Sequence, residues 1–195
     1  FAITKTRYVD ETSNQLLLRI DEADETRGLS EQAKERILSN FSGFGKSRAD
    51  LLIVSDYCKG FLSEQDLIDL SVIADISILD TKKKLSHEIV KSFNFIKLNE
   101  FEYDRNEEVL EDLSNQMRVI VTKGSKGVFH MGLNYPPPKV HQTFDVSGAG
   151  DIFTAGFGYN LALGKSIKDS IEIAQKYCSE VIQKRGTCKY EKNMD

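Results

Sequence analysis

The chain has 195 residues, which suits one ordinary domain, and its 40% hydrophobic and 29% charged residues give a globular rather than a disordered composition. The 26 Lys and Arg and 30 Asp and Glu give a net charge of −4, and the scattered basic residues argue against a nucleic-acid-binding surface. No apolar run approaches the ~20 residues of a membrane span and no signal peptide is recognisable, so we expect a cytoplasmic protein without membrane or nucleic-acid partners.

The opening segments 4–9 and 15–20 alternate like a β-hairpin, and an acidic link follows at 21–28. The chain starts without Met on this strand-like segment, and we expect that an N-terminal part of the domain is missing. Farther along, short β-branched runs alternate with helical segments, which is typical of an α/β fold with a mostly parallel sheet. Four runs are expected as core strands: 51–55 (LLIVS), 76–80 (ISILD), 93–97 (FNFIK) and 118–122 (RVIVT).

Helical periodicity predicts the connections between these strands. Ser63 is expected to cap a helix whose apolar face runs from Leu67 to Ala74, with Asp66 in the capping-box position. A second apolar stripe predicts a helix at 109–117.

The C-terminal part is expected to contain an antiparallel excursion and a long helix. Residues 126–131 and 139–144 alternate around the triple-proline segment 133–138, which we interpret as the turn. A stripe at 167–181 behind Ser166 predicts the helix. Met117 and Cys178 are expected in the core, and the three cysteines, none in CxxC spacing, are expected to be reduced.

The strongest chemical signal is the segment 145–151 (DVSGAGD), which precedes an apolar stretch expected to form a helix buried nearly all round. At such a helix start, Gly148, Ala149 and Gly150 can turn several unpaired N–H groups toward one point, where the helix dipole favours negative charge. Asp151 would hold a carboxylate beside this anion hole, in position to take a proton from a hydroxyl. The pattern indicates phosphoryl transfer; the alternative is a glycine-rich helix entry with a plain N-terminal carboxylate.

This segment resembles the signature of the PfkB, or ribokinase-like, carbohydrate kinase family, which reads DTxGAGD and continues F-x-A-G. Two more family motifs occur in the family's order: N-x-x-E as NEFE at 99–102 and T-x-G-x-x-G as TKGSKG at 122–127. Val146 and Ser147 depart from the signature, but its glycines and its final Asp are kept. The resemblance implies a three-layer α/β/α sandwich with a small β lid, and ATP and Mg²⁺ as nucleotide and metal.

The NEFE motif comprises Asn99, Glu100, Phe101 and Glu102, and it directly follows a predicted strand. The carboxyl end of a parallel strand is where α/β proteins bind ligands. Glu102 would hold a hydrated Mg²⁺ through water, and Asn99 would contact phosphate. The alternative is an Asn cap on a short acidic helix.

Two further segments are expected to border the nucleotide. In TKGSKG, Thr122 ends a strand, and Gly124 and Gly127 let the backbone approach a phosphate or ribose closely. Lys184 and Gly186 follow the last long helix, where the family places residues that flank the adenine. A plain helix C-cap is the alternative for this second pair.

Four segments narrow the resemblance to bacterial D-glycero-β-D-manno-heptose 7-phosphate kinases: TKTR at 4–7, NQLLLRID at 14–21, SDYCKG at 55–60 and LDTK at 79–82. In the last segment, Thr replaces the subgroup's Pro. The resemblance makes Arg7, Arg19, Lys59, Lys82 and Asp145 the candidates for binding the substrate and its phosphate. Plain surface solvation is the alternative for the two arginines.

We therefore predict an ATP-dependent sugar kinase that phosphorylates the anomeric hydroxyl of heptose 7-phosphate to the 1,7-bisphosphate in ADP-heptose biosynthesis, with Asp151 as general base. The chain would form the C-terminal two-thirds of one kinase domain, with lid or edge strands and a link at 1–28 and a nucleotide-binding core at 29–195. The expected protein partners are a second copy and an adenylyltransferase, fused or separate. Two alternatives are another PfkB-type kinase, for ribose, fructose or a nucleoside, and a catalytically silent nucleotide-binding fragment.

Overall fold

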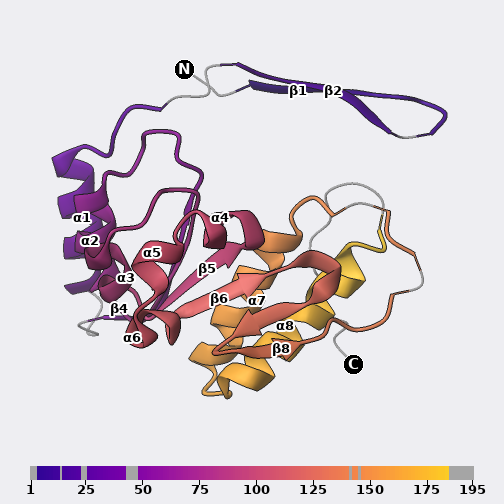
Figure 1. The fold of residues 1–195 in the computed structure, drawn as a ribbon. Coiled ribbons are helices and arrows are strands. Elements are labelled where there is room, and N and C mark those ends of the chain that lie inside the picture. Colours follow the sequence, from indigo (N-terminus) through magenta and orange to yellow (C-terminus); the bar gives the residue numbers. More distant parts are fainter. Residues whose placement is uncertain are drawn as a thin grey trace.

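The four apolar runs predicted as strands form the parallel centre of one sheet in the computed structural model, which describes residues 4–13, 15–22, 26–42, 48–140, 142–144 and 146–184 (Figure 1). In chain order the strands are β1 (Thr4–Val9), β2 (Leu16–Glu22), β3 (Ala49–Asp56), β4 (Ala74–Thr81), β5 (Phe95–Asn99), β6 (Val119–Thr122), β7 (Val128–His130) and β8 (Leu133–Tyr135). The helices are α1 (Glu31–Ser42), α2 (Glu64–Ser71), α3 (His87–Ser92), α4 (Glu100–Asp104), α5 (Glu107–Leu110), α6 (Leu113–Gln116), the 3-10 turn η1 (Gly124–Lys126), α7 (Ala149–Ala162) and α8 (Ile167–Val181).

The larger sheet has the order β3-β4-β5-β6-β7-β8. Strands β3 to β6 pair in parallel, and β7 and β8 are added antiparallel at one edge. The helices between the parallel strands are the crossover connections that parallel pairing requires. This confirms the predicted α/β fold with a mostly parallel sheet.

Each central strand supplies two separate cores, one on each face of the sheet. On β6, Val119 and Val121 pack into the cluster that includes α2 and α3, whereas Ile120 between them packs with α7 and α8. On β4, Leu79 and Ile78 divide in the same way. Successive side chains of a strand point to opposite faces, so a strand between two helix layers is apolar throughout. In Figure 1, α1, α2 and α3 lie on one side of the sheet and α7 and α8 on the other, which gives three layers.

Two predicted helix starts are formed as expected. Ser63 and Asp66 make a capping box, in which the Ser63 hydroxyl accepts the Asp66 N–H and the Asp66 carboxylate accepts the Ser63 N–H. Ser166 caps α8 by accepting the N–H three residues farther on. The helix α2 is shorter than predicted, because Ile73 and Ala74 lie beyond it, buried in the turn and at the start of β4.

The expectation of one helix at 109–117 is wrong. Two short helices, α5 and α6, occur there, because Asp112 accepts the N–H of Ser114 at 2.8 Å and starts a new helix. The break leaves Leu113 and Met117 63% and 56% exposed. Met117 is therefore not a core residue, whereas Cys178 packs against the core cluster under α7 and α8.

The predicted antiparallel excursion is present, but its turn lies elsewhere. Strands β7 and β8 pair around Met131 and Gly132, both with positive φ, and the three prolines follow β8. Proline has no N–H to donate to a ladder, which fits a segment that leaves the sheet. Within the described parts of 139–144, the expected second strand is not formed.

The predicted N-terminal hairpin is confirmed as an antiparallel pair, β1 and β2. In Figure 1 it stands apart from the three-layer body. Strand β2 continues to Glu22, so it takes the first two residues of the predicted acidic link. Among the described residues, no helix combines the length and apolar character needed to cross a membrane.

Candidate active site

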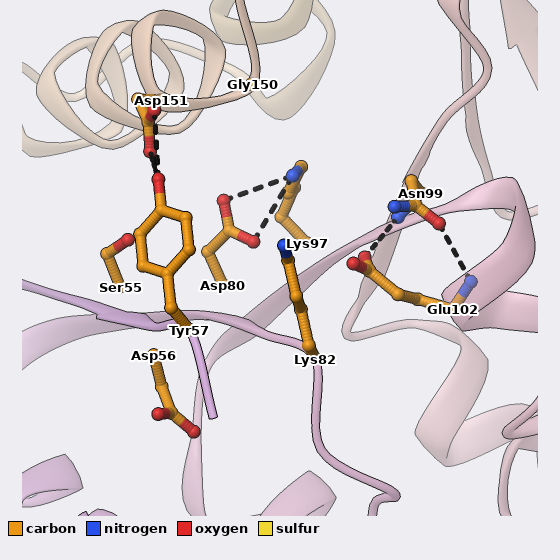
Figure 2. A pocket seen from close by; sticks show the side chains of 10 residues that line it. All are labelled: Ser55, Asp56, Tyr57, Asp80, Lys82, Lys97, Asn99, Glu102, Gly150 and Asp151. Atoms are coloured by element: carbon orange, nitrogen blue, oxygen red, sulfur yellow. Dashed lines mark hydrogen bonds and ion pairs between the residues drawn. The ribbon is translucent and has the colours of Figure 1, made fainter. Parts of the chain in front are cut away.

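A cleft lies between the carboxyl ends of the parallel strands and the start of α7 (Figure 2). Sheet register brings its charged residues together, because Asp80 of β4 pairs with Ser55 of β3 and with Lys97 of β5. The cleft volume is about 160 Å³, below the roughly 300–1,000 Å³ of pockets that enclose a whole small ligand, so it suits the reacting end of a larger one. The lining residues are Ser55, Asp56, Tyr57, Asp80, Lys82, Lys97, Asn99, Glu102, Gly150 and Asp151.

The start of α7 presents main-chain donors to this cleft. Gly148 has φ +81°, in the left-handed region that favours glycine, and it turns the chain into the helix. The N–H of Ala149 already donates to the Val146 carbonyl at 3.2 Å, so Ala149 does not supply a free donor as predicted. Among the described residues, no acceptor is found for the N–H groups of Gly150 and Asp151. These two groups are the donors available to an anion at this helix end.

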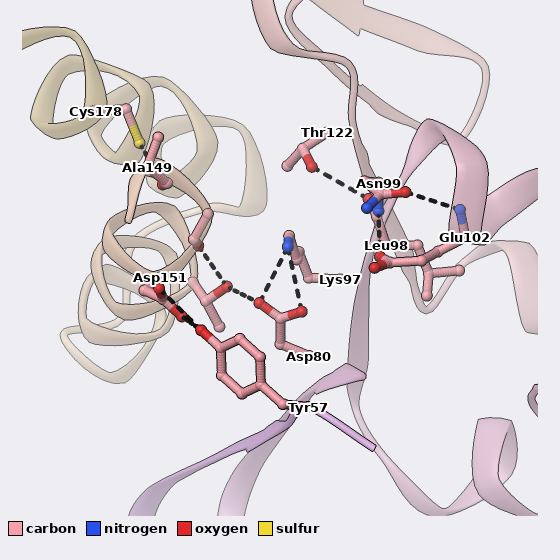
Figure 3. Close-up of polar contacts among 12 residues, drawn as sticks. Tyr57, Asp80, Lys97, Leu98, Asn99, Glu102, Thr122, Ala149, Asp151 and Cys178 are labelled. Carbon is pink, nitrogen blue, oxygen red and sulfur yellow. Dashed lines mark hydrogen bonds and ion pairs between the residues drawn. The ribbon is translucent and has the colours of Figure 1, made fainter. Parts of the chain in front are cut away.

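Cys178 of α8 holds the same turn from behind. Its thiol lies 3.2 Å from the Ala149 carbonyl, to which it donates a hydrogen bond (Figure 3). Burial raises the pKa of this thiol to about 12, so it remains a protonated donor at neutral pH. The cysteine predicted only as core packing therefore also fixes the start of α7.

Asp151 reaches into the mouth of the cleft and meets a residue to which sequence reasoning gave no role. The phenol of Tyr57 donates to its two carboxylate oxygens at 2.9 and 3.2 Å. The Lys82 ammonium lies 5.2 Å from the centre of the Tyr57 ring, in cation–π distance. Burial, and after it the hydrogen bond to Asp151, raises the pKa of Tyr57 above its ordinary value.

A buried ion pair links the start of α7 to the sheet. The Lys97 ammonium contacts both carboxylate oxygens of Asp80, at 3.2 and 3.1 Å (Figure 3). The Thr154 hydroxyl on α7 lies 3.0 Å from Asp80 and 2.9 Å from the Gly150 carbonyl. A Cβ added at Gly150 would lie 3.2 Å from the Lys97 nitrogen, so the cation sits directly beside the helix start.

Sequence reasoning placed Asp80 and Lys97 at strand ends but assigned them no function. A signal was present, since each is a charged residue at the end of a predicted strand whose other residues are largely apolar. Only the strand register brings their side chains together and next to Gly150.

The NEFE segment forms an Asn cap on a short helix, which was the alternative interpretation. It also brings two of its four residues into the cleft. Asn99 caps α4 by accepting the Glu102 N–H at 2.8 Å, and the Glu102 carboxylate accepts the Asn99 N–H at 2.8 Å. Both side chains line the cleft (Figure 2), and Glu102 is 6% exposed. The Glu100 carboxylate instead pairs with the two lysines of the TKGSKG turn, and Lys126 lowers the pKa of this carboxyl. Phe101 is 67% exposed, outside the cleft lining.

The TKGSKG turn lies beside NEFE, because Thr122 pairs in register with Asn99. The Thr122 hydroxyl donates to the Leu98 carbonyl at 3.3 Å. Gly124 and Gly127 have positive φ, and a Cβ at Gly127 would lie 2.2 Å from a backbone oxygen, so the tight turn requires glycine there. None of these three predicted residues lines the cleft.

The remaining predicted residues are scattered. Lys82 lines the cleft, whereas Lys59 does not. Arg7 and Arg19 are cross-strand partners in the separate hairpin, and Arg19 forms an ion pair with Asp21 at 3.0 Å. Neither arginine lines the cleft in the described structure. Lys184 lies in the turn that follows α8. The predictions for Asp145 and Gly186 fall outside the described residues.

Relatives match this chain over most of its length. A bifunctional protein HldE of Pasteurella multocida is 30% identical over 207 residues, which cover 95% of this chain and 41% of the relative. A bifunctional protein HldE of Campylobacter curvus is 27% identical over 195 residues, covering 90% of this chain and 41% of the relative. The chain thus spans about two-fifths of the length of these curated relatives.

Solved structures share the fold. Escherichia coli phosphofructokinase-2 in complex with potassium superposes with a TM-score of 0.72 at 16% identity, covering 95% of this chain and 67% of that one. Arabidopsis thaliana ribokinase complexed with ribose and ATP gives a TM-score of 0.68 at 19% identity, covering 95% and 64%. At these identities the likeness concerns the fold, which is the ribokinase-like fold predicted from the motifs.

The family model for pfkB family carbohydrate kinases matches residues 58–193. That match covers more than half of the chain and includes the carboxyl ends of β4, β5 and β6 and the helix start at Gly148, whereas the cleft-lining end of β3 lies just before it. This chain belongs to the pfkB family of carbohydrate kinases.

Proposed function

We propose that this chain carries the phosphoryl-transfer site of an ATP-dependent sugar kinase. The observation that supports this most directly is the cleft itself, in which the Asp151 carboxylate, the main-chain donors at the start of α7 and the Lys97 ammonium lie together. A base beside a cluster of anion-binding donors is what transfer of a phosphoryl group to a hydroxyl requires.

In the proposed reaction, Asp151 takes the proton of the acceptor hydroxyl as its oxygen attacks the γ-phosphorus of ATP. The bond between that phosphorus and the bridging oxygen breaks, and ADP leaves with the electron pair. The N–H groups of Gly150 and Asp151 stabilise the charge on the transferring group, whereas that of Ala149 is engaged in the turn that Gly148 makes. Lys97 adds a fixed positive charge beside Gly150.

The charges of the cleft fit a magnesium nucleotide. Four carboxylates line it, those of Asp56, Asp80, Glu102 and Asp151, against the ammonium groups of Lys82 and Lys97. A bare polyphosphate would be repelled by this excess of negative charge, and a bound Mg²⁺ would offset it.

No group of three or more His, Cys, Asp and Glu that could hold a metal directly is found among the described residues. This suits a hydrated Mg²⁺ that keeps its waters and the nucleotide's phosphates as ligands, with Glu102 holding it through water and Asn99 contacting phosphate. The ion would neutralise charge that develops on the phosphates.

We infer that the nucleotide extends from the cleft along the NEFE and TKGSKG segments. Thr122, Gly124 and Gly127 would border it, and their position in register beside Asn99 supports this. The capping interaction ties Glu100 and Phe101 to the same segment, although their side chains do not line the cleft. Lys184 and Gly186 are proposed to flank the adenine.

For the acceptor, we propose the anomeric hydroxyl of D-glycero-D-manno-heptose 7-phosphate, as a step toward ADP-heptose. Support comes from the sequence segments TKTR, NQLLLRID and SDYCKG and from the HldE relatives. Lys82 already lines the cleft, and Lys59, Arg7, Arg19 and Asp145 are proposed as further substrate or phosphate contacts. Because the relatives are bifunctional and longer, a fused or separate adenylyltransferase is the proposed functional partner.

We propose that residues 29–195 are part of one nucleotide-binding core and that the hairpin within 1–28 is a lid. Tyr8, Leu18 and Ile20 of this hairpin are 41–53% exposed, and an isolated two-stranded sheet is marginally stable in water. Packing against a second copy of the chain would cover them, which supports a homodimer through the lid strands.

The test is ADP release by the polypeptide expressed from its natural first residue, with Mg·ATP and heptose 7-phosphate, ribose or fructose 6-phosphate as acceptor. Asp151→Asn is expected to lower kcat by ~10²–10⁴ while ATP binding, measured by calorimetry, is kept. Turnover on ribose or fructose 6-phosphate alone would keep the mechanism and reject the heptose. Equal kcat for Asp151→Asn would reject the base, and ATP binding without any turnover would favour a silent nucleotide-binding fragment.

A further inference from the structure

Tyr57 follows the carboxyl end of β3 and lies over the proposed base. Its phenol donates to both oxygens of Asp151, at 2.9 and 3.2 Å, and Figures 2 and 3 show the two side chains meeting at the mouth of the cleft. Among the described residues, no other group donates a hydrogen bond to this carboxylate. The phenol is therefore the contact that sets the orientation of Asp151.

The loop that carries Tyr57 is held in place by its neighbours. The buried Asp56 carboxylate accepts the N–H of Cys58 at 3.0 Å and the hydroxyl of Thr81 at 2.9 Å. Cys58 adopts φ +57°, a conformation that non-glycine residues rarely take, so the loop keeps a strained turn directly after Tyr57. Lys82 contacts the ring at cation–π distance. The position of the phenol is thus determined by the surrounding structure.

A carboxylate has two oxygens with about four acceptor positions, so a donor can occupy one oxygen while the other receives a proton. A base that is free to rotate presents the reacting oxygen only part of the time, and holding it in one orientation raises the rate of transfer. Asp151 stays exposed beside the phenol, so an acceptor hydroxyl can still reach the carboxylate. A phenol that stays protonated at neutral pH can hold the carboxylate in this way.

We propose that Tyr57 is a positioning residue for phosphoryl transfer: its phenol holds the Asp151 carboxylate in one orientation, with the shorter hydrogen bond to Oδ1, and leaves the remaining acceptor positions of the carboxylate to the acceptor hydroxyl. The proposal rests on the proposed role of Asp151 as general base. It assigns a function to the tyrosine of the SDYCKG segment, next to the cleft-lining Asp56.

Tyr57→Phe tests this, because it removes only the hydroxyl. We expect kcat with the acceptor sugar to fall about tenfold, as for loss of one charge-assisted hydrogen bond, with the KM for ATP unchanged. The KM for the acceptor sugar should change less than kcat, because the phenol acts on the base. Tyr159→Phe, which alters an exposed tyrosine of α7 outside the cleft lining, is the matched control and should keep kcat and both KM values.

A structural role alone would change stability but would leave the kcat of the folded protein unchanged. Tyr57→Phe with unchanged kcat would overturn the proposal. A second measurement does not depend on turnover: the titration of Tyr57, followed by NMR of ¹³Cζ-labelled tyrosine and assigned with Tyr57→Phe. Asp151→Asn is expected to lower the pH at which Tyr57 titrates, since the raised pKa of the phenol comes in part from Asp151.

The two readouts separate the proposals. If Asp151→Asn leaves the titration of Tyr57 unchanged, the phenol does not bind the carboxylate and the positioning role is wrong, whatever the kinase activity. If the wild-type protein phosphorylates no acceptor, the proposed function fails and takes the role of Tyr57 in transfer with it, while the titration still reports the hydrogen bond.

Discussion

Replacing Lys97 by Met should separate the structural from the chemical contribution of the ion pair beneath α7. The Lys97 side chain is 9% exposed and contacts both oxygens of Asp80, whose side chain is 16% exposed. Removal of one partner of a buried pair costs about 3–5 kcal/mol when the other charge stays buried. In the Lys97→Met variant, Asp80 remains partly exposed to solvent and keeps a hydrogen bond from Thr154. We therefore expect a smaller loss of unfolding free energy, about 2–3 kcal/mol.

The assay is urea unfolding followed by circular dichroism, with the free energy of unfolding taken from the midpoint and slope. The double variant Lys97→Met with Asp80→Asn removes both charges, and we expect it to recover at least about 1 kcal/mol relative to the sum of the single variants. Lys126→Met is the control, since Lys126 is 66% exposed and its solvent-screened pair with Glu100 should contribute little to the free energy of unfolding.

The reasoning would be refuted if Lys97→Met were no less stable than the Lys126→Met control, or if the double variant showed the plain sum of the two single losses. Either result would mean that the Lys97 and Asp80 charges are solvated independently. Activity gives a second readout. Because the Lys97 ammonium lies beside Gly150, the double variant should still have a lower kcat than the wild-type protein, although its stability is partly recovered.

Three further predictions follow from local geometry. Gly148→Ala forces a Cβ onto a backbone with φ +81° and should cost about 1–2 kcal/mol of unfolding free energy, measured by urea titration. It should also lower kcat. An unchanged kcat would show that the turn at Gly148 does not position the anion-binding donors. Hydrogen bonds from Ser63 hold the pKa of Asp66 below its ordinary value, so its stabilisation is present above about pH 4 and is lost as the pH falls through the lower folded-state pKa; Asp66→Asn should show a smaller loss of stability on acidification, and equal losses would contradict the assignment. With the other two cysteines replaced by serine, the Cys178 thiol, whose pKa burial raises to about 12, should react with Ellman's reagent at pH 8 only after unfolding, and rapid labelling of the native protein would disprove its burial.

Local sequence signals were sufficient to predict the elements whose structure depends on residues close together in the sequence. The four apolar runs became the parallel strands, Ser63 and Ser166 cap their helices, and the glycine-rich turn at Gly148 starts α7 beside Asp151. The same kind of reasoning failed at 109–117, because the Asp112 side chain starts a second helix there and overrides the apolar stripe.

By itself, the sequence determined the α/β class, the family motifs and the position of the proposed base, because strand periodicity, capping and glycine turns are set within a few residues. Only the tertiary structure decided that Tyr57 covers Asp151, that Asp80 binds Lys97, and that Glu100 and Phe101 turn away from the cleft that Glu102 lines. It also left Arg7 and Arg19 on a separate hairpin. These outcomes depend on the register between strands and the packing of α7 on the sheet, which join residues tens of positions apart and leave no local pattern in the sequence.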